Sequence, residues 1–106
     1  VDANHAYNLK DALYVGKGLD ELDIYWFEEP VAPEDYEGYR ELKQKISTSI
    51  AGGEAEFTKY GWNKLISNKC IDIAQPEVCG LGGITEYLKV TALGFLVNFF
   101  ARLALN

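Results

Sequence analysis

The chain of 106 residues contains no methionine, two cysteines and one histidine. Cys70 and Cys79 are too few and too isolated for a disulfide scaffold or a C-x-x-C metal site. We therefore expect reduced thiols in a cytoplasmic protein. Because methionine is missing even from the first position, we expect the chain to be a piece of a longer protein.

Basic residues are also scarce, with ten lysines and arginines against sixteen acidic residues and a net charge of −6. They form no cluster, so the sequence lacks the basic surface that binds nucleic acid. Long apolar runs are missing as well, since the apolar stretch at 93–101 is far too short to span a bilayer. We expect one soluble domain with neither a nucleic-acid nor a membrane partner.

Strand-like and helix-like segments alternate along the chain. Short apolar runs predict strands at 1–4, 24–27, 49–53, 71–75 and 97–100. Helical periodicity and helix-start residues predict helices at 9–22, 35–45, 57–68 and 84–93. This alternation with short loops is typical of a parallel α/β fold, here a partial TIM-type (β/α) barrel of about four consecutive βα units.

Three acidic residues, Asp2, Glu28 and Glu54, each end a strand-like run, and they are spaced at equal intervals of 26 residues. The carboxyl ends of the strands in a parallel barrel meet at one face, where the active site is built. Carboxylates placed there in register are the oxygen ligands that a hard divalent cation prefers. Adjacent side chains of a strand point to opposite faces, so only one of Glu28 and Glu29 need point toward the site. We choose Glu28 because it has the matching interval.

The motifs V-D-A-N, W-F-E-E-P, G-G-E and Q-P-E-V-C-G-L-G-G-I-T-E resemble those of the enolase superfamily, in its mandelate racemase/muconate lactonizing enzyme branch. The resemblance runs from Val1 to about Leu93. It implies that residues 1–106 belong to a (β/α)7β barrel domain, from the end of its third strand to about its seventh. It also implies that Asp2, Glu28 and Glu54 bind Mg²⁺, or Mn²⁺ in its place.

The resemblance further implies a Mg²⁺-dependent enzyme that removes the α-proton of a small carboxylic acid. The expected activity is that of a sugar-acid dehydratase, racemase or cycloisomerase. Glu77 stands where the family has an aspartate that orients a catalytic histidine after the seventh strand. Where the family has Pro-His, this chain has Ala101 and Arg102, and an arginine stays protonated and cannot act as a base.

His5, the single histidine, lies three residues after Asp2. It is a candidate acid/base or hydrogen-bond donor to substrate, and the alternative is a solvated loop or helix-cap residue. The G-L-G-G segment at 80–83 lacks the G-x-G-x-x-G spacing and the Walker lysine, so we interpret it as a turn.

Two functions remain open from the sequence. The first is part of an enzyme, with little or no turnover by the chain alone. The second is a catalytically inactive barrel segment that folds by association, because about four βα units cannot close a barrel and leave open strand edges. Such edges would be covered by a second copy or by missing barrel parts.

Overall fold

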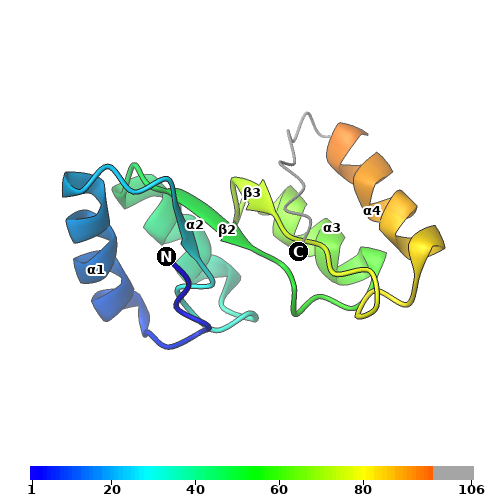
Figure 1. The fold of residues 1–106 in the computed structure, drawn as a ribbon, viewed down its shortest axis with the longest axis horizontal. Helices are drawn as coiled ribbons and strands as arrows, with labels where there is room; N and C mark the ends of the chain where they lie inside the picture. Colours follow the sequence, from blue (N-terminus) through cyan, green and yellow to red (C-terminus); the bar gives the residue numbers. More distant parts are fainter. Residues whose placement is uncertain (97–106) are drawn as a thin grey trace.

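The computed structural model describes residues 1–96, which form four helices around a parallel three-stranded sheet. The elements follow in the order α1 (Leu9–Glu21), β1 (Trp26–Glu28), α2 (Tyr36–Lys45), β2 (Ser49–Gly52), α3 (Lys59–Ser67), β3 (Ile73–Ala74) and α4 (Ile84–Leu96). Helix α1 packs against α2 at one end of the molecule, and α3 packs against α4 at the other (Figure 1).

The sheet has the order β1-β2-β3, with every pair parallel. Asp2 forms a single parallel bridge with Glu28. This bridge lies on the opposite side of β1 from β2. Each of these four extended segments is followed by a helix, which confirms the predicted series of βα units. The strand predicted at 97–100 and the residues Ala101 and Arg102 lie outside the described part of the chain.

Polar N-cap residues start the first three helices, because a side-chain oxygen satisfies a backbone N–H that has no partner within the helix. Asn8 accepts from the N–H of Asp11 at 2.9 Å in α1. Asp35 accepts from Gly38 at 2.9 Å in α2. Thr58 caps α3, so this helix begins at Lys59, two residues later than predicted.

Several strands are shorter than predicted, because other hydrogen bonds replace those of the sheet ladder. The backbone N–H of Ile24 donates to the end of α1, and β1 therefore starts only at Trp26. The Asp72 carboxylate accepts the N–H of Ile50 at 2.8 Å, in a place where a ladder bond would form. Strand β3 is therefore limited to Ile73–Ala74.

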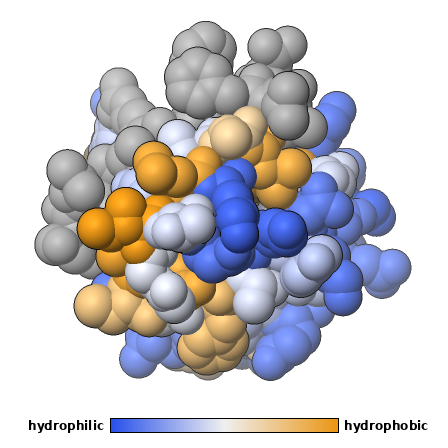
Figure 2. Space-filling view, turned by 90° about the vertical axis from the view of Figure 1, so that its right-hand side faces the viewer, coloured by the Kyte–Doolittle hydropathy of each residue, from blue (hydrophilic) through white to orange (hydrophobic). Residues whose placement is uncertain are grey.

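The core lies between the sheet and the helices, and its largest fully buried side chains include Trp62, Phe27, Leu42 and Ile50. In contrast, Ile84 and Leu88 of α4 are exposed. Figure 2 views the end of the molecule where α4 lies and shows apolar surface there around a hydrophilic patch. Within residues 1–96, no helix is long and apolar enough to cross a membrane.

Candidate metal site

Asp2 and Glu28 are brought together by the backbone bridge between their strands. Asp2 is exposed, and its Oδ1 accepts the N–H of Asn4 at 2.9 Å. Glu28 is half-buried, and its Oε2 accepts from Nε1 of Trp26 at 3.2 Å. The structure therefore places these two predicted ligands at the same level of the sheet, as their sequence spacing suggests.

Glu54 does not occupy the same level. The register partner of Glu28 on β2 is Ala51, and Glu54 follows three positions later, beyond the end of the strand at Gly52. Equal sequence intervals therefore do not give equal sheet positions, because the loops and helices between the strands differ in length. Glu54 is exposed and belongs to the loop that leads into α3.

Glu29 is the site residue that sequence reasoning missed. Its side chain is only 2% exposed, and its φ of +42° takes it out of the strand, so the alternation rule used to exclude it does not apply. Burial raises the pKa of Glu29 to about 7, and the negative charges of Glu54, Asp2 and Glu28 add to this rise, while His5 opposes it. The only sequence signal was the acidic pair before Pro30.

His5 contacts this buried carboxylate, with 3.1 Å between its Nε2 and Oε2 of Glu29. Its backbone N–H donates to the carbonyl of Glu29 at 2.8 Å. Asn4, His5 and Glu29 are three of the five non-glycine residues in residues 1–96 that have positive φ. Such backbone conformations are costly and are concentrated at functional sites in many proteins. The solvated-loop interpretation of His5 is therefore incomplete, because the side chain has a specific partner.

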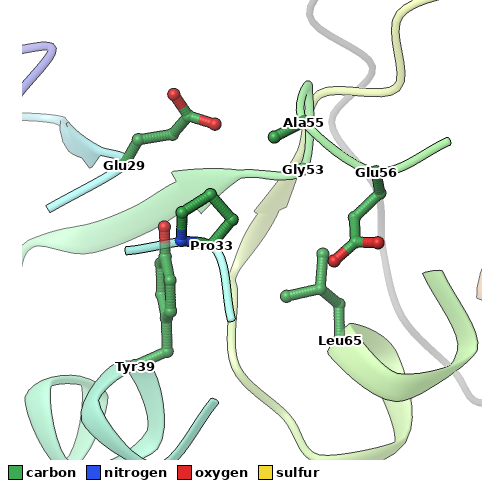
Figure 3. Close-up of a pocket in the computed structure, with 7 residues that line it drawn as sticks. All are labelled: Glu29, Pro33, Tyr39, Gly53, Ala55, Glu56 and Leu65. Carbon is green, nitrogen blue, oxygen red and sulfur yellow. The ribbon is translucent and has the colours of Figure 1, made fainter. Parts of the chain in front are cut away.

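A small pocket lies behind this edge of the sheet, and Figure 3 shows Glu29, Tyr39, Gly53 and Glu56 around it. Its volume of about 10 Å³ is close to the least that a single water molecule needs. Burial raises the pKa of Glu56, although its Oε1 accepts a hydrogen bond from the hydroxyl of Tyr36 at 3.2 Å. Two acidic residues, Glu29 and Glu56, thus line this pocket, and burial raises the pKa of both.

Glu77 is exposed after β3 and closes its own turn. Its carboxylate accepts the backbone N–H groups of Gly80 and, at 3.0 Å, Cys79. These two hydrogen bonds hold the pKa of Glu77 below its usual value. The turn lies near the Glu54 loop, because a Cβ on Gly80 would be 3.9 Å from the carbonyl oxygen of Glu54. The G-L-G-G segment thus begins within this turn, with both Gly82 and Gly83 at positive φ.

The carboxylates suit a hard divalent cation in their chemistry and in their common position at the carboxyl edge of the sheet. As placed, however, no three metal-ligating side chains of residues 1–96 converge closely enough to hold one ion. Asp2 and Glu54 are both exposed, so their side chains can change rotamer without disturbing the core. The donor set therefore fits Mg²⁺, and the site requires side-chain rearrangement to bind it.

A parallel βα series with a helix after each extended segment is the architecture of a segment of an α/β barrel. Residues 1–94 match the family model described as "Enolase C-terminal domain-like". The chain belongs to this family, which confirms the resemblance seen in its motifs.

Among curated relatives, the chain is 38% identical over 96 residues to D-galactarolactone cycloisomerase of Agrobacterium fabrum, a match covering 91% of this chain and 25% of the relative. The structure of 3,6-anhydro-D-galactonate cycloisomerase from Zobellia galactanivorans is 47% identical, with a TM-score of 0.88 over 92% of this chain and 28% of that one. The structure of L-talarate dehydratase from Polaromonas sp. JS666, complexed with Mg and L-glucarate, is 29% identical to this chain. Its TM-score is 0.90, and the match covers 95% of this chain and 28% of the dehydratase. The chain thus spans about a quarter of the length of these proteins.

Proposed function

We propose that this chain supplies the metal-binding part of an enolase-superfamily active site that removes the α-proton of a carboxylate substrate. The substrate class would be a sugar acid or its lactone, and the reaction dehydration, racemisation or cycloisomerisation. Family membership and the cycloisomerase and dehydratase relatives support this class of enzyme.

The observation that carries the proposal is the position of Glu29. This buried carboxylate experiences the charges of Asp2, Glu28 and Glu54 together, although the three residues are far apart in the sequence. Acids gathered around a buried acid raise the energy of the folded state, and the contact with His5 opposes this effect without cancelling it, since the pKa of Glu29 stays raised. An arrangement of this kind favours a bound cation, and it is difficult to explain as a requirement of folding alone.

In the proposed site, Asp2, Glu28 and Glu54 would hold Mg²⁺. When bound, the cation would act as a Lewis acid that stabilises charge on the substrate carboxylate. The backbone N–H of Asn4 and the indole N–H of Trp26 donate to Asp2 and Glu28, and so limit the orientations of these two ligands. Glu54 has the freedom of an exposed loop residue to complete the set.

For proton transfer, we propose His5 as the acid/base candidate within this chain. Glu77 keeps the place of the family's orienting aspartate, but its carboxylate is engaged by two backbone N–H groups of its own turn. A role for Glu77 in proton transfer would therefore require that turn to open.

Calorimetric titration of the 106-residue chain with Mg²⁺ tests the metal site. We expect Glu54→Gln to lower the association constant by at least about tenfold, because a neutral amide replaces a charged ligand. Glu21→Gln, at the last residue of α1, is the matched control and should bind as the wild type does. Equal affinity in all three proteins would remove Glu54 from the site.

Turnover is a separate question. We expect little or no activity from the chain alone on a panel of sugar acids, since it spans about a quarter of the relatives it matches. Strong Mg²⁺-dependent turnover would contradict this expectation.

We also propose that the chain associates, with a second copy or with the rest of a barrel. The exposed Ile84 and Leu88 on α4 and the two-residue edge strand β3 support this. Analytical ultracentrifugation that found only a stable monomer would contradict association with a second copy.

A further inference from the structure

His5 and Glu29 are joined by two contacts that come from different parts of each residue. The side chains meet at 3.1 Å between Nε2 and Oε2, and the backbone N–H of His5 donates to the carbonyl of Glu29 at 2.8 Å. Both residues have positive φ, at +62° and +42°. Two segments 24 positions apart therefore adopt costly backbone conformations at the point where these two residues meet.

The two partners differ in burial. The Glu29 side chain is 2% exposed and cannot move without disturbing its surroundings, whereas the His5 side chain is 28% exposed. A pair of exposed residues would contribute little and would not fix either side chain. Here the buried carboxylate of Glu29 is fixed by its surroundings, and it in turn fixes the more accessible imidazole of His5.

The two ring nitrogens of His5 have different environments. Nε2 faces the carboxylate of Glu29, which in its ionised form only accepts hydrogen bonds, so this nitrogen is then the natural place for the ring proton. Nδ1 is shielded from solvent and has no hydrogen-bond partner among the described residues. A buried N–H without an acceptor is costly, so a proton on Nδ1 is disfavoured.

We propose that Glu29 is a positioning residue for His5, which it holds with the ring proton on Nε2. The proposal rests on the proposed function, in which His5 is the acid/base candidate. It goes beyond that function by naming the residue that orients His5 and the ring nitrogen that carries the proton of the neutral imidazole. Glu29 would act only through His5 and would not itself bind the metal.

Nitrogen-15 NMR of the chain labelled at histidine tests this directly, because His5 is the only histidine and its two ring signals need no assignment. In a buffer alkaline enough to keep the ring neutral, we expect a single tautomer with a slowly exchanging Nε2–H. Glu29→Leu should remove this protection and allow the Nδ1–H form to appear. Glu29→Gln should shift the Nε2 signal, and Glu37→Gln, at an exposed position in α2, should leave the spectrum unchanged.

A wild-type spectrum dominated by Nδ1–H would overturn the proposal, as would unchanged His5 signals in a folded Glu29→Leu protein. If the leucine variant does not fold, unchanged signals in the near-isosteric Glu29→Gln would overturn it instead. A purely structural role for Glu29 would change the unfolding free energy without altering the tautomer.

Combining this measurement with Mg²⁺ titration separates the failure of the two proposals. Glu29→Gln should alter the His5 signals and lower the Mg²⁺ association constant less than tenfold. Glu54→Gln should do the reverse, with a large loss of Mg²⁺ affinity and a wild-type tautomer. Absence of Mg²⁺ binding in the wild type would refute the metal site alone. A loss of Mg²⁺ affinity in Glu29→Gln as large as that in Glu54→Gln would instead assign Glu29 to the metal and overturn its positioning role.

Discussion

Asp2 and Glu28 are direct partners in a parallel backbone bridge, so two carboxylates project from adjacent strands at the same level. Their sequence separation of 26 residues, one strand and one helix, suggested this proximity, and α1 is the helix that connects the two positions. Like charges at paired positions of neighbouring strands destabilise a sheet. The pair therefore has a cost in folding that a bound cation would offset.

Removing one charge of this pair should separate stability from metal binding. Without divalent cations, we expect Asp2→Asn to raise the unfolding free energy by roughly 0.2–1 kcal/mol, because repulsion from Glu28 is relieved. The asparagine side chain can still accept the N–H of Asn4. The stabilisation by added Mg²⁺ should decrease in the same variant. Urea denaturation with and without Mg²⁺ measures both effects.

Asp23→Asn is the control for this experiment, since Asp23 is exposed and its φ of +52° is tolerated by asparagine. A metal-free stability for Asp2→Asn clearly below that of this control would contradict the predicted repulsion.

Gly53 positions the Glu54 loop through close contact with Trp62. Its φ is +111°, and a Cβ there would lie 2.3 Å from Cη2 of the buried indole. We expect Gly53→Ala to lower the unfolding free energy by about 2–4 kcal/mol, from backbone strain and overpacking together. Gly82→Ala, with φ of +91° and nothing within 4 Å, should cost only about 1–2 kcal/mol. Equal losses in chemical denaturation would show that contact with Trp62 is unimportant.

Asp20 joins the end of α1 to the segment that enters β2. Its carboxylate accepts from the hydroxyl of Thr48 at 2.7 Å and from the backbone N–H of Ser47 at 3.0 Å. Burial alone would raise the pKa of Asp20, but these hydrogen bonds outweigh it and hold the pKa below 3.8. The stabilisation is therefore complete above pH 3.8 and is lost as the pH falls through the lower folded-state value.

Asp20→Asn should accordingly lower stability by about 1 kcal/mol near neutral pH and reduce the loss of stability in acid. Thermal unfolding at a series of pH values measures this, with Glu21→Gln as the control for removal of a neighbouring charge. Parallel pH profiles for Asp20→Asn and the wild type would refute the contribution of this carboxylate.

Local sequence signals were sufficient for the type and order of the elements. N-cap residues such as Thr58 and the apolar periodicity act within a few positions, so they can be recognised without tertiary information. Strand ends were harder to predict. Asp72 accepts a hydrogen bond from Ile50, 22 positions away, and this contact helps to shorten β3. Nothing in the residues near Asp72 announces that partner.

Some residues of the candidate site could likewise be predicted from local sequence, and others could not. The three acids could be named from their position after strands, and the sheet places two of them in register. Glu29 could not be named, because the alternation rule holds only while the chain stays extended, and at Glu29 the backbone leaves the strand. Its partner His5 was named as a candidate acid/base from its position three residues after Asp2, but its contact with Glu29 could not be foreseen.

The alternating elements, the family motifs and the acidic residues suited to a divalent cation can be read from the sequence, since they depend on residue type and short-range spacing. The folded chain is needed to see that Glu29 is buried beside His5, that Glu54 lies beyond the level of Glu28, and that Glu77 closes its own turn. Burial and charge repulsion arise only when distant segments meet. The protonation and orientation of the site residues are therefore properties of the fold.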